Sequence, residues 1–189
     1  MKQPTISFLI PTLGREDGLK RCIDSIDCIN YPRELMEVCV LYGEEQTVPE
    51  KVAEGVSKTT GEYIIFAAND TEFTPESINE ALKIDKALVA FNTGNQKGSG
   101  GECEHFIIRR DFLPRIGGEI FDTDFWHCGV DNLLQAKAEK LKEFAVAESA
   151  IVNHYHFSKG TPKDEVYEKG WSHVEEDRAL LEKKLKELK

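Results

Sequence analysis

Polar and acidic side chains directly follow a strongly apolar stretch near the middle of the chain. Residues 63–66 read Tyr-Ile-Ile-Phe, an apolar run typical of a strand buried on both faces of a parallel sheet. The polar residues that follow are Asn69, Asp70, Thr71 and Glu72. Ligands of open α/β sheets bind beyond the carboxyl ends of the strands, and carboxylate oxygens suit Mg²⁺ or Mn²⁺, which in turn hold phosphates. The stretch therefore predicts a metal-assisted phosphate site, with a solvated acidic turn as the alternative.

Two further groups have the chemistry of a binding site. His154 and His156 are two residues apart, so on a strand they share a face, either as a metal-binding pair or as a plain surface pair. The segment 121–128 is aromatic and acidic and includes Asp124 and Trp126. This segment either lines a ligand pocket or is an ordinary loop.

Strands and helices alternate along the chain, which predicts an α/β domain with a mostly parallel sheet flanked by helices. Thr47 and Glu50 have the spacing of a capping box, and Thr74-Pro75 resembles a helix start. The apolar patterns predict parallel strands near 6–10, 37–42, 62–67 and 87–91, short strands at 106–108 and 150–152, and helices over 17–28, 47–58, 75–85 and 129–143.

The last part of the sequence predicts a helical extension. A domain over 1–160 is expected to end before a helical segment, 161–189, that packs on it. Beyond Gly170 a narrow apolar seam includes Trp171, Val174, Leu181 and Leu185. This seam either packs against the domain or pairs two copies into a homodimer. The glycine-rich segment 92–101 is expected to be a loop, either mobile over a substrate or a simple connection.

Bulk composition excludes several classes of protein. The chain has 189 residues and a net charge of −10, from 24 basic and 34 acidic side chains, which argues against nucleic acid as a main partner. No apolar run has the length of a membrane span, and the apolar segment near the N-terminus is too short for a signal peptide. The five cysteines include no C-x-x-C pair, so reduced thiols and a cytoplasmic location are expected.

Three stretches, in this order, resemble the family-two glycosyltransferases, which have the GT-A fold. The first is Ser-Phe-Leu-Ile-Pro-Thr at 7–12, the second is Gly-Glu-Tyr-Ile-Ile-Phe at 61–66 running into Asn69-Asp70, and the third is Gly-Val-Asp at 129–131. His154 resembles the histidine that closes many of these domains. The resemblance extends over about 6–156.

The resemblance implies a metal-assisted transfer of a sugar from a nucleotide-sugar donor to an acceptor hydroxyl. Asp70 and His154 would hold Mn²⁺ or Mg²⁺ against the donor diphosphate, with Glu72 as a possible further ligand. Asp131 would remove the proton from the acceptor hydroxyl, giving inversion at the sugar carbon. Asp124 and Trp126 would face the acceptor. The residues expected at the nucleotide are Pro11, Thr12, Arg15, Tyr42 and Asn69.

Several positions depart from the family pattern. The acidic residue that often ends the second strand is replaced by Tyr42-Gly43, where Tyr42 would stack on the base instead. An Arg-Asn pair falls on Val52-Ala53, and the first Asp of a D-x-D element falls on Ala68. These departures favour the alternative of a catalytically silent nucleotide- or carbohydrate-binding module. A nucleotidyltransferase is a third interpretation, but a basic, glycine-rich phosphate loop is missing near the N-terminus.

Overall fold

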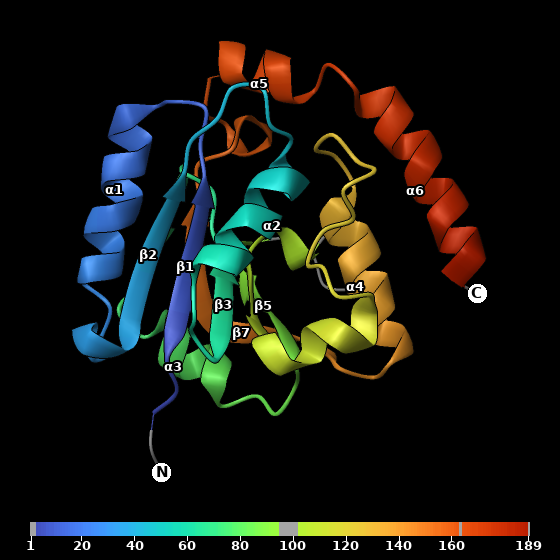
Figure 1. Cartoon of the computed structure of the whole chain (residues 1–189). Coiled ribbons are helices and arrows are strands. Elements are labelled where there is room, and N and C mark those ends of the chain that lie inside the picture. Colours follow the sequence, from blue (N-terminus) through green and yellow to red (C-terminus); the bar gives the residue numbers. More distant parts are fainter. Residues whose placement is uncertain (1–2, 95–101, 163, 189) are drawn as a thin grey trace.

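A seven-stranded sheet with helices on both faces forms the body of the protein (Figure 1). The computed structural model describes residues 3–94, 102–162 and 164–188. The strands are β1 (Ile6–Pro11), β2 (Met36–Leu41), β3 (Tyr63–Phe66), β4 (Thr71–Phe73), β5 (Leu88–Asn92), β6 (Phe106–Arg109) and β7 (Phe144–His154). The α-helices are α1 (Glu16–Asp27), α2 (Val48–Lys58), α3 (Ser77–Leu82), α4 (Val130–Lys140), α5 (Glu165–Gly170) and α6 (Val174–Leu188). Short 3₁₀ segments lie at Arg33–Leu35, Glu102–Glu104, Arg110–Ile116 and Phe157–Lys159.

Five of the seven strands in the described residues point the same way, with three parallel and three antiparallel pairings. The strand order of the sheet is β2-β1-β3-β6-β5-β7-β4. β1 pairs in parallel with β2 and β3, and β5 pairs in parallel with β7. β6 runs antiparallel to both β3 and β5, so all four strands predicted to be parallel point the same way. β4 is antiparallel to β7 at the sheet edge. The predicted α/β class is confirmed.

Alternating side chains of the strands fill two apolar layers, one on each face of the sheet. On β1, Phe8 and Ile10 face a core that includes side chains of α1 and α3, whereas Leu9 faces a second core with α2 and α4. Figure 1 shows α1 and α2 on opposite sides of β1. α6 lies outside α4, and Leu181 and Leu185 pack against the second core. No helix in the described part of the chain is long and apolar enough to cross a membrane.

Local signals located most elements well, and the differences have physical reasons. The capping box of Thr47 and Glu50 forms as predicted. The helix expected from 75 begins only at Ser77, because the Thr74 hydroxyl donates to the Ile151 carbonyl (2.9 Å) beside the β4–β7 pair. The strand expected at 150–152 is the end of the much longer β7, whose first half pairs with β5. Most of the glycine-rich segment, 95–101, lies outside the described residues.

Gly61 lies just before β3 and contacts β1 and β2 closely, because it has no side chain. Its N–H donates to Ser7 Oγ (2.8 Å) and to Glu37 Oε1 (3.0 Å). A β-carbon at this position would lie 2.5 Å from Ser7 Oγ and 2.7 Å from Ser7 N. The backbone of β1 is therefore too close to tolerate any side chain here.

We expect Gly61→Ala to lower the free energy of unfolding by roughly 1–3 kcal/mol, the usual cost of overpacking a well-packed interior. Urea denaturation measures it. Gly170→Ala is the control, because the nearest atom to its added β-carbon is His127 Cδ2 at 3.7 Å, an ordinary contact. Equal stabilities of the two variants would contradict the close packing at Gly61.

Candidate functional site

The pairing of β4 with β7 brings Asp70 and His154 together. Thr71 is opposite His154 in this pair, and the Tyr155 N–H donates to the Asp70 carbonyl (2.8 Å). The register between β5 and β7 shifts at Phe91/Asn92, so β7 has an irregularity before it reaches β4. As a result His154 Nε2 lies 3.4 Å from Asp70 Oδ1.

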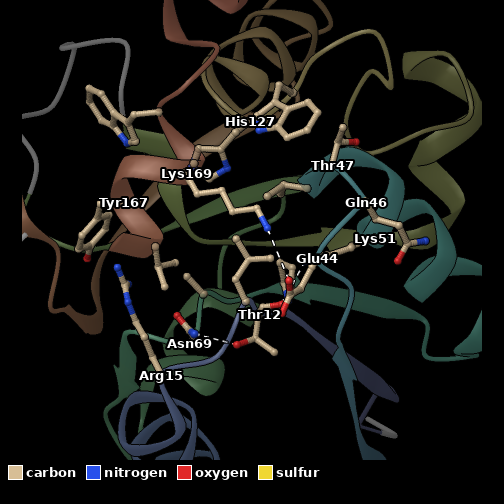
Figure 2. Close-up of a pocket in the computed structure, with 18 of the residues that line it drawn as sticks. Thr12, Arg15, Glu44, Gln46, Thr47, Lys51, Asn69, His127, Tyr167 and Lys169 are labelled. Carbon is tan, nitrogen blue, oxygen red and sulfur yellow. Dashed lines mark hydrogen bonds and ion pairs between the residues drawn. The ribbon is translucent and has the colours of Figure 1, made fainter. Parts of the chain in front are cut away.

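The second oxygen of the Asp70 carboxylate is covered by two side chains from opposite ends of the chain. Tyr167 donates its hydroxyl to Asp70 Oδ2 (2.7 Å), and Arg15 Nη1 lies 3.3 Å from the same oxygen. The Arg15 guanidinium stacks on the Tyr167 ring at 3.8 Å and is held by Asp164 through contacts of 2.7 and 2.5 Å. Figure 2 shows Arg15 and Tyr167 side by side at one end of the pocket.

These partners determine the charge of Asp70. Burial alone raises the pKa of this carboxyl, but the pairing with His154 and the Tyr167 hydrogen bond outweigh burial and hold the pKa well below its usual range. Burial likewise opposes the charged form of His154, and the contacts with Asp70 and Glu104 raise its pKa nonetheless. Glu104 Oε2 lies 3.1 Å from His154 Nδ1. Asp70 is thus an anion beneath a layer of donors.

The donor set around Asp70 fits a divalent cation with two protein ligands. Asp70 Oδ1 is buried without a hydrogen bond and lies 3.4 Å from His154 Nε2, so a carboxylate oxygen and an imidazole nitrogen are close enough to bind one cation. Among the described residues, no group of three or more His, Cys, Asp or Glu is arranged to hold a metal. A cation here would therefore complete its shell with ligand phosphate oxygens and water.

A first cavity of about 130 Å³ lies beside this pair, at the carboxyl ends of β1 and β3 (Figure 2). Its wall includes the predicted nucleotide residues Pro11, Thr12, Arg15 and Asn69, together with Trp126. The Asn69 amide donates to Thr12 Oγ1 and to the Gly14 carbonyl, both at 2.8 Å, which fixes the loop after β1 against the end of β3. We call this space the first cavity.

A second cavity of about 460 Å³ shares a wall with the first, because Phe66, Ala68, His127 and Tyr167 line both. Asp131 and His154 line only the second cavity. Asp131 lies in the first turn of α4, after Gly129 in the left-handed conformation (φ 79°). Burial raises the pKa of Asp131 to about 6, and the nearby charge of Glu104 acts in the same direction.

The loop leading to Asp131 is held by one buried carboxylate of α6. Asp177 is 3% exposed and accepts three backbone N–H groups in succession, from Trp126 (2.8 Å), His127 (2.8 Å) and Cys128 (2.7 Å). Leu181 of the same helix lies against Gly129, where a β-carbon would be 3.0 Å from Leu181 Cδ2. α6 thus positions the segment that starts α4.

Three candidates from the sequence lie apart from this cleft. The Tyr42 side chain is 67% exposed and lines neither cavity. Asp124 pairs with Lys184 of α6 (2.7 Å) at the surface. Glu72 accepts the Tyr155 hydroxyl (2.6 Å) and also lines neither cavity. The structure therefore brings together Asp70, His154 and the loop after β1, but not these three side chains.

Sequence reasoning missed most of the wall that α5 and α2 provide. Tyr167 and Trp171, four residues apart, line both cavities, and Lys51 of α2 lines the first. The four-residue spacing of two large aromatic side chains was the one visible signal, since such a pair shares a helix face. His127, on the loop before α4, lines both cavities.

Comparison with solved structures finds a similar fold in several glycosyltransferases, although no family model and no curated protein sequence matches the chain. The mannosyltransferase PcManGT from Pyrobaculum calidifontis, in complex with GDP-Man and Mn²⁺, superimposes with a TM-score of 0.68 at 14% identity. The match covers 81% of this chain and 57% of that one.

Two other neighbours are complexes with other ligands. S. aureus TarS in complex with UDP-GlcNAc gives a TM-score of 0.67 at 13% identity, over 85% of this chain and 59% of TarS. The catalytic domain of Drosophila beta1,4-galactosyltransferase 7, in complex with xylobiose, gives a TM-score of 0.65 at 10% identity. That match covers 87% of this chain and 77% of the galactosyltransferase domain. The chain thus spans less than two thirds of the mannosyltransferase and of TarS.

We expect Asp177→Ala to lower the free energy of unfolding by at least about 2 kcal/mol, because it leaves three backbone N–H groups without their acceptor. Urea denaturation measures the change. Glu176→Ala, next to it on the exposed side of α6, is the control and is expected to stay within about 0.5 kcal/mol of the parent. If both variants behave alike, Asp177 does not anchor the loop.

Asp131→Asn is expected to raise the melting temperature at pH 8. The folded state holds the Asp131 proton more tightly than the unfolded chain, since its pKa is raised to about 6. The contribution of this group to stability is therefore present at low pH and is lost as pH rises through about 6. The gain measured by calorimetry should accordingly shrink between pH 8 and about pH 4. A gain independent of pH would contradict a desolvated carboxylate at this position.

Proposed function

We propose that this chain, which has the GT-A fold of nucleotide-sugar glycosyltransferases, is itself a glycosyltransferase that moves a sugar from a nucleotide-sugar donor to an acceptor hydroxyl. One observation carries the proposal. His154 and Asp131 line the second of two adjoining cavities at the carboxyl ends of the central strands, and Asp70, which lines neither cavity, pairs with His154. The neighbours in complex with GDP-Man and with UDP-GlcNAc support a donor of this class.

The first cavity is proposed to take the nucleoside, and the second the sugar and the acceptor. Apolar walls such as Val48, Phe66 and Trp126 suit a flat base. Arg15 and Asp70 stand where the donor diphosphate would pass between the two spaces. Tyr167 now occupies Asp70 Oδ2, so donor binding would require its hydroxyl to move. A divalent cation held by Asp70 and His154 would neutralise charge on the departing diphosphate.

Asp131 is proposed as the general base. Its pKa of about 6 is close to the pH of a neutral solution, where a carboxylate base combines a deprotonated state with useful basicity. The acceptor oxygen would give its proton to Asp131 and bond to the anomeric carbon. The bond from that carbon to the diphosphate oxygen would break on the opposite face, which inverts the configuration.

A second candidate function has specific support. Ala68 lines both cavities where a carboxylate would strengthen cation binding, and Asp70 is covered by Arg15 and Tyr167. A binding module that holds a nucleotide sugar without transferring it fits these two facts. Binding and turnover therefore have to be measured separately.

Asp70→Asn is expected to weaken Mn²⁺-dependent binding of a nucleoside diphosphate, whereas Asp131→Asn should bind normally and turn over about 10²–10⁴-fold more slowly. His154→Ala should resemble Asp70→Asn in a milder form. Titration calorimetry with and without Mn²⁺, beside donor-hydrolysis rates, measures both properties. Asp111→Asn is the matched control, because that carboxylate is exposed and pairs only with Arg109 in the described structure.

The outcomes separate the two candidates. If the parent protein binds no nucleoside diphosphate with any metal, the glycosyltransferase proposal is wrong. Binding without measurable turnover would favour the silent module. An Asp131→Asn variant as active as the parent would leave Asp131 as no more than the polar start of α4.

A further inference from the structure

Lys51 places a buried ammonium group in the first cavity. It lies in the first turn of α2, and its side chain is 2% exposed. Nζ donates one hydrogen bond, to the Thr12 carbonyl (3.0 Å), at the end of β1 (Figure 2). Within the described ranges, Lys51 forms no ion pair with a carboxylate. An amine with three donors thus has one protein acceptor.

Burying the Lys51 ammonium with one acceptor costs the unliganded protein stability. A buried charge is costly unless it is paired and hydrogen-bonded, and the first turn of a helix favours acidic over basic side chains. Burial lowers the pKa of Lys51, the charge of Lys169 lowers it further, and Glu44 acts in the opposite direction. The amine therefore has unused capacity for acceptors, and the cavity is the place from which they would come.

Gly43 gives the lysine stem its space. A β-carbon at Gly43 (φ 151°) would lie 3.5 Å from Lys51 Cε and 2.5 Å from Gln46 Oε1. The backbone after β2 thus passes beside the lysine stem at ordinary contact distance, whereas a side chain at Gly43 would displace Gln46. The position of the amine is set by packing and is not that of a free surface lysine.

We infer that Lys51 Nζ hydrogen-bonds O6 of guanine or O4 of uracil in the donor and selects these keto bases over adenine and cytosine. The inference rests on the proposed function. Guanine O6 and uracil O4 accept from an amine, whereas adenine and cytosine present an amino group, a further donor, at the corresponding position. Lys51 lines only the first cavity, whereas Asp131 and His154 line only the second. The amine therefore lies in the cavity proposed for the nucleoside.

The test is a panel of GDP, UDP, ADP and CDP, titrated by calorimetry with Mn²⁺ into the parent protein, Lys51→Met and Lys169→Met. The parent should bind at least one keto nucleotide about 10-fold or more tightly than both amino nucleotides, as expected for a hydrogen bond to a charged group. Lys51→Met should reduce that preference to within about 3-fold. Lys169→Met removes the same charge from the rim of the same cavity and should keep the preference.

Pyrophosphate in the same titrations separates base from phosphate contacts. If Lys51→Met weakens all four nucleotides and pyrophosphate equally, the amine contacts phosphate and the inference is wrong. Equal affinity of the parent for all four nucleotides overturns the inference without any variant. The test therefore still works if the Lys51→Met protein fails to fold. If the parent binds none of the four nucleotides, the proposed function and the inference are both wrong. If it binds them without preference, only the inference is wrong.

Discussion

The buried charge of Asp70 is the constraint on which the architecture of the cleft depends. A carboxylate at this depth is tolerated only when charges or donors surround it. Those partners come from three distant regions: Arg15 after β1, His154 at the end of β7 and Tyr167 in α5. Compensating one charge therefore fixes the loop after β1, the edge of the sheet and the C-terminal segment relative to one another.

The cleft contains a second carboxylate under opposite conditions. Asp131 is desolvated, and no cation among the described residues compensates it, so its pKa is raised, whereas the pKa of Asp70 is lowered by its partners. Two carboxylates with diverging pKa values in one site can take different roles, one as a permanent anion and one as a proton acceptor. The difference follows from the surroundings of each residue, since both are aspartates.

Local patterns in the sequence were sufficient to predict the central strands, the capped start of α2 and the GT-A fold. They failed where structure depends on distant partners. The first half of β7 contains alanine and glutamate and resembles helix, and only pairing with β5 makes it a strand. Asp70, Asp131 and His154 were proposed because each adjoins a recognisable element, and they stay a prediction. Lys51 and Tyr167 were missed because helical positions alone do not tell which side chains reach a cleft built by other elements.

The clamp between Arg15 and Asp164 joins residues 149 positions apart. Contacts of such sequence separation form late, because closing a long loop of chain costs entropy before the contact is gained. The sheet around β1, β2 and β3 can assemble from the first third of the chain, but the cleft acquires its upper wall only when α5 docks. During synthesis on a ribosome, the scaffold would therefore exist for some time before it has a finished binding site, with Asp70 still open to water.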